Sequence, residues 1–223
     1  MPLNKSKGNM YEFITHTWNT VKGACYHDCV YCYMKSIAKR YKKPQPPPFF
    51  DEKELKTNLG NGNFIFVGSS NDLFASNIPE EWIEKTLEHC DKFDNKYLLQ
   101  TKNPARFEEF SGYFRSSDIL VTTLETNRHY PIMENVPHPY DRVRAMERLN
   151  ISAMITIEPI MDFDFPYFVE MIKQCKPQQV NIGADSGNNN LPEPSKEEVL
   201  ELISELEKFT IVKQKSNLSR LLK

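Results

Sequence analysis

The sequence lacks any long apolar segment. None of its hydrophobic runs reaches the roughly 20 residues that a membrane-spanning helix needs, and the first five residues lack the apolar core of a signal peptide. The 223 residues carry a formal net charge of −2, so no global excess of one sign points to nucleic acid or to an anionic membrane. We therefore expect a cytoplasmic protein that binds no membrane, and any binding to a polyanion must be local.

Cysteine is also scarce, and its distribution argues against a disulfide framework. Only five cysteines are present, an odd number, and three of them, Cys25, Cys29 and Cys32, fall close together. A chain of this length can bury a sizeable core without disulfides, and clustered thiols are typical of a metal site in a reducing compartment. Cys90 and Cys175 lie in segments with helical periodicity, and we expect both to be buried apolar residues.

Strand-length runs rich in Val, Ile and Phe alternate with segments that have apolar residues at helical spacing. The six expected strands are 11–18, 63–68, 96–101, 118–123, 152–158 and 179–183. This alternation is typical of a parallel sheet with helical crossovers, and six units are too few for a closed eightfold barrel. The sequence therefore predicts an α/β fold, a partial (β/α)6 TIM-like barrel with parallel strands, in a single domain covering residues 1–223.

Residues typical of helix starts and of loops support this assignment of strands and helices. Pro79 precedes two glutamates at a helix start, and Ser195 with Glu198 forms a capping box that opens the last helix. The proline-rich residues 44–48 cannot be helical and are predicted to be a surface connection. Residues from about 210 to 223 are predicted to be a C-terminal extension.

Polar clusters follow the predicted strands with regularity. They occupy residues 68–72, 101–103, 123–128, 158–159 and 183–187. In parallel α/β sheets, ligands bind beyond the carboxyl ends of the strands. We therefore expect these clusters to surround one binding mouth.

The three clustered cysteines follow the first predicted strand with the spacing C-x3-C-x2-C, in a loop of residues 23–34. Soft thiolates at close spacing select zinc or iron–sulfur chemistry. Structural zinc usually takes four ligands, and electron-transfer ferredoxins supply a fourth cysteine. Three cysteines leave one iron of a cluster open to another ligand, although a zinc site remains an alternative at this point.

With Tyr31 as the aromatic residue before the last cysteine, this loop resembles the cluster loop of the radical S-adenosylmethionine (SAM) superfamily. Further matches follow in order at 17–19, 66–74, 99–102, 157–160 and 183–187. They resemble in particular a little-characterised group of phage and bacterial radical SAM proteins, which is similar to spore photoproduct lyase in its Thr-Lys strand end. The resemblance implies a [4Fe-4S] cluster on Cys25, Cys29 and Cys32, with SAM as the second cofactor. The cluster would reductively cleave SAM to a 5'-deoxyadenosyl radical that abstracts hydrogen from a substrate.

The resemblance also implies which strand ends contact the methionine part of SAM. Ser69, Ser70 and Asp72 are expected near its amino group, because their oxygens accept hydrogen bonds from an ammonium. Lys102 is expected to reach its carboxylate as a compact cation on a flexible stem, with Thr123 donating a second hydrogen bond.

The adenosine part is expected to meet a second group of residues. Glu125 is suited to accept from ribose hydroxyls. Gly183 and Ala184 resemble the backbone edge that contacts adenine, and Tyr31 would pack on the same base. The resemblance further implies an electron donor such as flavodoxin or ferredoxin.

Several points stay open. The substrate is unidentified, and a nucleotide or nucleic acid is the leading hypothesis, by association alone. A DNA photolesion lyase of the spore photoproduct lyase type and a non-catalytic cysteine–zinc module are the alternatives. No catalytic side chain is assigned, and Glu158 either lines the barrel interior or holds a substrate. The basic stretch from Lys35 to Lys43 is either a solvated face or a contact for a nucleic-acid backbone.

Overall fold

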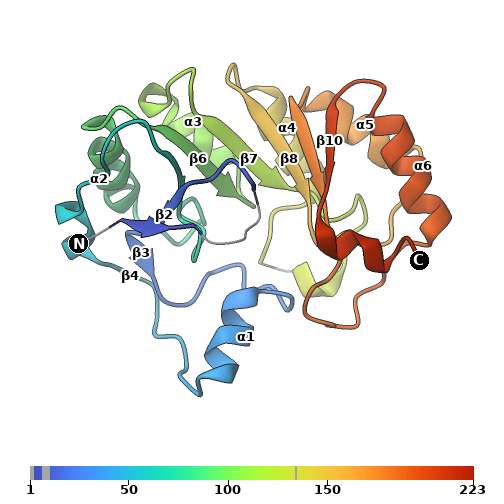
Figure 1. Cartoon of the computed structure of the whole chain (residues 1–223), viewed down its shortest axis with the longest axis horizontal. Coiled ribbons are helices and arrows are strands. Elements are labelled where there is room, and N and C mark those ends of the chain that lie inside the picture. Colours follow the sequence, from blue (N-terminus) through green and yellow to red (C-terminus); the bar gives the residue numbers. More distant parts are fainter. Residues whose placement is uncertain (1–2, 7–10, 134) are drawn as a thin grey trace.

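An eight-stranded, mostly parallel sheet forms the centre of the computed structural model, which describes residues 3–6, 11–133 and 135–223 (Figure 1). Its order is β1-β2-β5-β6-β7-β8-β9-β10. The strands are β1 (Asn4–Lys5), β2 (His16–Trp18), β5 (Phe64–Val67), β6 (Lys96–Thr101), β7 (Ile119–Thr123), β8 (Ala153–Ile157), β9 (Gln179–Ile182) and β10 (Ile211–Gln214). In the described part of this sheet only β1 pairs antiparallel with its neighbour, so the predicted α/β fold with mostly parallel strands is confirmed.

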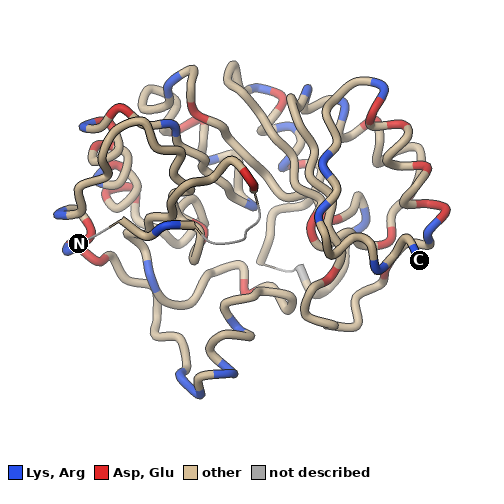
Figure 2. The backbone as a smooth tube through the Cα atoms, viewed as in Figure 1, with Lys and Arg blue, Asp and Glu red and all other residues tan. Residues whose placement is uncertain are grey.

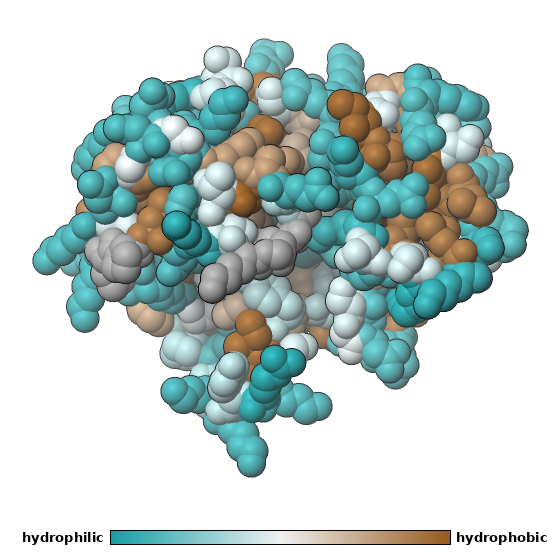
Figure 3. Space-filling model, viewed as in Figure 1, coloured by the Kyte–Doolittle hydropathy of each residue, from teal (hydrophilic) through white to brown (hydrophobic). Residues whose placement is uncertain are grey.

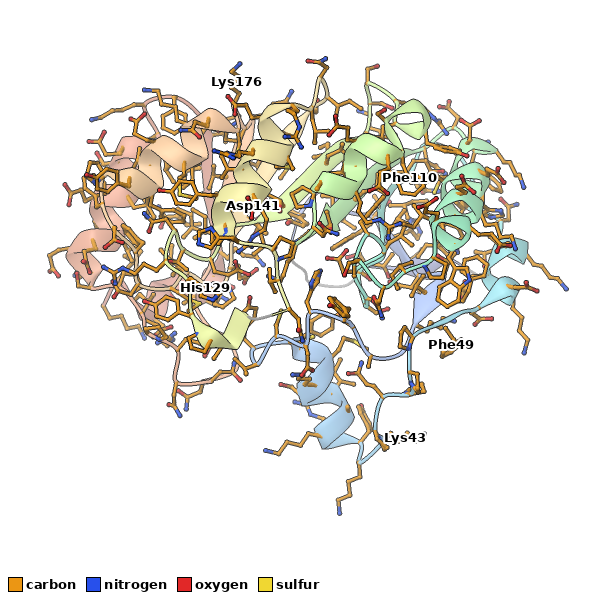
Figure 4. The ribbon with its side chains drawn as sticks, turned by 180° about the vertical axis from the view of Figure 1, so that it is seen from behind. Lys43, Phe49, Phe110, His129, Asp141 and Lys176 are labelled. Atoms are coloured by element: carbon orange, nitrogen blue, oxygen red, sulfur yellow. The ribbon has the colours of Figure 1, made fainter. Side chains whose placement is uncertain are left out.

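The order of the strands determines on which side of the sheet the connecting helices lie. They are α1 (Tyr33–Arg40), α2 (Glu80–Asp91), α3 (Ala105–Glu109), α4 (Pro139–Glu147), α5 (Tyr167–Gln174) and α6 (Lys196–Leu206). Because consecutive parallel strands are neighbours and crossovers are right-handed, the connecting helices return on the same side of the sheet. Accordingly, α3, α4 and α5 lie in front of the strands when the molecule is seen from behind, and α2 and α6 lie at the two flanks (Figure 4). Helix α1 stands apart and projects from the body (Figure 1).

The two faces of the sheet carry different cores. Alternate side chains such as Ile65, Leu99 and Ile155 join the helices in the large core. The opposite face carries a smaller cluster that includes Phe66 and Leu98, and Tyr11 packs on it. No helix among the described residues combines the length and the apolar character needed to cross a membrane.

Five of the six predicted strands match the structure to within one or two residues. The first is wrong in its first half, since only β2 (His16–Trp18) is strand. Residues Tyr11 and Ile14 instead form a turn, closed by a hydrogen bond from the Ile14 N–H to the Tyr11 carbonyl, and their side chains fill the face of the smaller core. These residues are apolar because they are buried in the smaller core, and this apolar pattern wrongly predicted a strand.

The region predicted only as a C-terminal extension contributes β10, which pairs in parallel with β9. A short pair, β3 (Val21–Lys22) and β4 (Phe49–Phe50), was also not predicted. The capping box of Ser195 and Glu198 opens α6 as expected. Cys90 and Cys175 are buried, which confirms their predicted place.

Candidate cofactor site

The loop that carries the three clustered cysteines lies against the carboxyl ends of the parallel strands. We name residues 23–32 the cysteine loop. The Tyr31 hydroxyl donates to Glu125, which follows β7, at 2.5 Å. The His27 ring contacts Asp72, which follows β5, at 2.8 Å. The loop therefore lies at the edge of the sheet where the polar clusters were predicted to meet.

The backbone at the start of this loop is held by the proline-rich segment. Gly23 has φ +95, and a Cβ on it would lie 2.5 Å from the carbonyl oxygen of Pro47, so a side chain does not fit. The Ala24 N–H donates to the Pro46 carbonyl at 2.8 Å. Residues 44–48 thus position the first part of the cysteine loop, although they lie about 20 residues further along the chain.

Two successive turns shape the backbone between the three cysteines. The N–H of Asp28 donates to the Cys25 carbonyl at 3.2 Å, and that of Cys32 donates to the Cys29 carbonyl at 3.1 Å. Cys32 is then the N-cap residue of α1. The side chain of Cys29 is buried in a small cluster with Val136, in the segment after β7.

All three thiols are free, but in the described residues no group of three or more Cys, His, Asp or Glu side chains is arranged to hold a metal ion. Burial raises the pKa of Cys25 to about 12, and the nearby Asp72 carboxylate adds to this. Burial also raises the pKa of Cys29. A thiolate at Cys25 or Cys29 therefore needs an added positive charge, which a metal or cluster would supply. Three soft donors in a half-buried loop fit an iron–sulfur cluster in their chemistry.

Asp72 is the main connection between the cysteine loop and the strand ends. Its Oδ2 accepts from the Thr101 hydroxyl at 2.9 Å and from the Lys102 N–H at 2.8 Å, as well as facing His27. Its Oδ1 accepts from the Phe74 N–H at 3.0 Å. The carboxylate is thus occupied by protein donors, and in this structure it joins the ends of β5 and β6 to the loop.

His27 connects this site to the segment after β7. Its Nε2 faces Asp72, and its Nδ1 lies 2.8 Å from the backbone carbonyl of Asn135. The ring therefore lies between two hydrogen-bond acceptors, one from the end of β5 and one from the segment after β7. Burial alone would raise the pKa of Asp72, but His27 and the N–H donors hold it below its usual value. The His27–Asp72 contact therefore holds the cysteine loop to the strand ends.

A second buried cluster surrounds Glu125, whose side chain is 0% exposed. Its Oε1 accepts from Tyr31 and from the Lys102 ammonium, and its Oε2 accepts from Arg142 of α4 at 2.8 Å. Arg142 also donates to the Thr123 carbonyl. We name Tyr31, Lys102, Glu125 and Arg142 the Glu125 cluster.

The charges in this cluster stabilise one another. Burial alone would raise the pKa of Glu125, but Arg142 and Lys102 hold it far below its usual range. Burial alone would lower the pKa of Lys102, yet the Glu125 carboxylate keeps it raised. Tyr31 has its pKa raised by burial and by Glu125, so it stays a neutral donor. Among the described residues, Arg142 Nε and Nη2 have no hydrogen-bond partner.

The predicted serines lie beside Asn19, which follows β2. The Asn19 side-chain oxygen accepts from the Ser69 hydroxyl at 3.2 Å and from the Ser70 N–H at 2.8 Å. Both serines are half-buried at the end of β5. They lie at the predicted edge, where Asn19 orients the turn that carries them.

Gly183 and Ala184 lie at the end of β9, next to polar side chains that follow β8 and β10. Glu158 pairs with Lys215, which follows β10, and accepts from Asn217 at 3.0 Å. Asn217 also donates to the Ala184 carbonyl at 2.8 Å. A Cβ on Gly183 would lie 2.7 Å from Glu158 Oε1, so the glycine makes room for this carboxylate. Glu158 therefore lies just beyond β8, bound to the C-terminal segment.

Thr123 belongs to a polar row on the smaller-core face. Its hydroxyl accepts from Gln100 at 3.1 Å, and the Gln100 side-chain oxygen accepts from Tyr11 at 2.9 Å. The next strands continue the row with Thr156 and Asn181, paired in register. In the described chain, Thr156 Oγ1 and Asn181 Nδ2 are buried without a hydrogen-bond partner.

The structure brings the predicted residues together in two groups. The larger contains the three cysteines, Tyr31, Ser69, Ser70, Asp72, Lys102, Thr123 and Glu125. The other contains Gly183 and Ala184 with Glu158.

Sequence reasoning missed Arg142, Lys215 and Asn217. Arg142 lies in a helix with apolar neighbours, and a buried arginine there has no local signature. Lys215 and Asn217 lie beyond the last predicted strand.

Comparison with protein families finds one match. The sequence profile of a family described as a protein of unknown function (DUF5131) matches residues 9–196, which include the cysteine loop and both groups of predicted residues. A comparison with curated proteins finds no match.

Proposed function

The chain belongs to the DUF5131 family of proteins of unknown function, and we propose that it is a radical SAM enzyme whose cysteine loop holds a [4Fe-4S] cluster. The observation that carries the proposal is the C-x3-C-x2-C loop, which lies against the carboxyl ends of a parallel sheet. Neighbouring strands follow in chain order with helices on one face, which supports a partial TIM-like barrel in a single domain. Its open side would admit a large substrate.

In this proposal Cys25, Cys29 and Cys32 hold the cluster, and SAM binds the strand ends beside them. When bound, the reduced cluster supplies the electron that cleaves SAM to methionine and a 5'-deoxyadenosyl radical. The protein's own residues bind and orient the cofactors and limit access of water. The apolar contact of Cys29 with Val136 supports that last role.

The hydrogen bonds within the site indicate which side chains are available to contact the amino and carboxylate groups of SAM. Ser69 and Ser70 are half-buried at the end of β5 and remain our candidates for the SAM amino group. Lys102 and Thr123 remain those for the carboxylate, with Lys102 held in place by Glu125. Asp72 has its oxygens engaged by protein donors, which supports a positioning role for it.

The adenosine contacts are proposed in the same way. Gly183 and Ala184 would offer backbone to adenine, and Tyr31 would pack on the same base. Glu125 would serve the ribose only through its remaining lone pair, because Tyr31, Lys102 and Arg142 already occupy it.

An electron donor such as flavodoxin or ferredoxin is part of this proposal, as is a cytoplasmic location, because the thiols must stay reduced. The substrate is unidentified. A nucleotide or nucleic acid is our working class.

Anaerobic reconstitution with iron and sulfide tests the cofactor assignment. We expect about four irons and four sulfides per chain, with brown absorbance. Replacing any one of Cys25, Cys29 or Cys32 by Ala should abolish cluster binding, whereas Cys90→Ala and Cys175→Ala should leave it intact. One tightly held zinc per chain in place of iron would support the cysteine–zinc module and contradict the proposal.

A second assay tests the chemistry. Reduced, reconstituted protein incubated with SAM should release 5'-deoxyadenosine. A protein with an intact cluster and bound SAM that forms none of this product would not be a radical SAM enzyme. Repair of a DNA photolesion by the same preparation would favour the lyase alternative.

A further inference from the structure

The projecting helix α1 and the turn after it have an unusual charge composition. Residues 29–50 contain five Lys or Arg and no Asp or Glu, in a chain whose formal net charge is −2. The cations are Lys35, Lys39, Arg40, Lys42 and Lys43. Figure 2 shows these basic residues along the projecting part. We name residues 33–43 the α1 lobe.

Most of these cations lack an acidic partner. Among the described residues, only Lys35 of this group forms an ion pair, with Asp28 at 2.7 Å. Lys39, Arg40, Lys42 and Lys43 are exposed, and Lys43 lies at the far tip of the lobe (Figure 4). Four unpaired cations on a short projection make a local positive field that attracts a polyanion.

The same lobe presents aromatic and apolar side chains to solvent. Helix α1 has no buried residue. Tyr33, Ile37 and Tyr41 recur at four-residue spacing, so they share one face, and they are 48%, 41% and 66% exposed. In Figure 3 the lobe carries a hydrophobic patch bordered by hydrophilic side chains. The Tyr33 hydroxyl donates to the Ser69 carbonyl at 2.8 Å, which fixes this face relative to the strand ends.

We propose that the α1 lobe is a docking surface for single-stranded nucleic acid. Cations that contact a phosphate backbone, interleaved with exposed aromatic rings on which bases stack, are the two components of such surfaces. This inference does not depend on the radical chemistry. It places a bound strand beside the cysteine loop, because α1 begins directly after Cys32.

An acidic protein partner fits the lobe less well. An eight-residue helix is about 12 Å long and offers a narrow ridge, whereas a stable protein interface buries about 800 Å² on each side. Lysine is also depleted at protein interfaces, and most of the cations of the lobe are lysines.

The test measures binding of fluorescent oligo(dT) and oligo(U), each of about 15 nucleotides, to the full chain by anisotropy over a range of salt. We expect binding of at least one, weakening as salt rises. The variant Lys39→Gln, Arg40→Gln, Lys43→Gln should reduce the slope of log K against log salt by about 2, because each phosphate contact contributes about 0.7. The control variant Lys92→Gln, Lys173→Gln, Lys196→Gln removes equal charge elsewhere and should leave the slope unchanged.

Stacking is tested separately. Tyr41→Ala should weaken binding about 5- to 150-fold, since a stacked base contributes about 1–3 kcal/mol. Tyr167 is 67% exposed on α5 and gives a matched control, so Tyr167→Ala should bind normally.

The inference is overturned if neither oligonucleotide binds, or if the lobe and control variants weaken binding equally. It is also overturned if the lobe variants bind the oligonucleotides as tightly as the wild type does. If those variants are then no longer reduced by an acidic redox protein, the α1 lobe is a docking surface for that protein instead. Since binding is measured without SAM or reductant, its failure is distinct from a failure of cluster assembly, which iron content reports.

Discussion

Replacing Glu125 by Gln should destabilise the protein strongly, because the substitution removes a buried carboxylate that binds both Arg142 and Lys102. Glu125 and Arg142 are both 0% exposed at their side chains, and Lys102 is 16% exposed. Breaking a buried ion pair by removing one partner typically costs about 3–5 kcal/mol, because the remaining charge is left uncompensated. We expect Glu125→Gln to lower the free energy of unfolding by that amount at pH 7, measured by urea denaturation.

The pH dependence gives an independent check. The folded pKa of Glu125 lies below its unfolded value of about 4.3, so its stabilisation is fully present above that pH and is lost as the pH falls through the folded pKa. The difference in unfolding free energy between the wild type and Glu125→Gln should therefore be constant from about pH 6 to 8. It should narrow only in acid, below about pH 4.

Two further variants make the reasoning refutable. Glu205 pairs with Lys208 on the surface, and Glu205→Gln should cost at most about 1 kcal/mol. Replacing the buried group together, by Glu125→Leu, Lys102→Met and Arg142→Met, should recover much of the stability, since no unpaired charge remains. If Glu125→Gln cost no more than Glu205→Gln, the Glu125 cluster would not be a buried, mutually stabilised group.

Three other substitutions test particular contacts. Gly183→Ala should lower stability by about 1–3 kcal/mol, because its Cβ would lie 2.7 Å from Glu158 Oε1, and adding Glu158→Ala should restore it; a tolerated Gly183→Ala would contradict the close approach. Gly23→Ala should reduce the iron content of reconstituted protein, because its Cβ would meet the Pro47 carbonyl at 2.5 Å; normal loading would show that the loop entry can shift. Ser195→Ala removes the cap of α6 and should cost about 1 kcal/mol, or about 2–4 °C in Tm; an unchanged Tm would mean that packing alone holds this helix end.

The sequence by itself determined the main strands and the place of the cysteine loop. The strand β6 (Lys96–Thr101) lies where it was predicted, because a buried strand of a parallel sheet is a short apolar run that can be read locally. The capping box of Ser195 and Glu198 is equally local. The spacing of the cysteines needs no tertiary information, and neither does the polar character of the strand ends.

The sequence was less informative where the burial pattern of a segment does not match its backbone hydrogen bonding. Tyr11 and Ile14 belong to the smaller core but form a turn, so their apolar pattern wrongly predicted strand. Strand β10 has mostly exposed residues, so its burial pattern resembles that of a tail. Its pairing with β9 depends on where the rest of the sheet ends.

Only the tertiary structure decided the partners within the site. His27 meets Asp72 across 45 positions of sequence, and Arg142 reaches Glu125 from the following helix. Local periodicity can place a side chain on a face of its own element, but it says nothing about the charge that another element brings to that face. Such pairs depend on how strands and helices are packed, and that packing is set by the whole core.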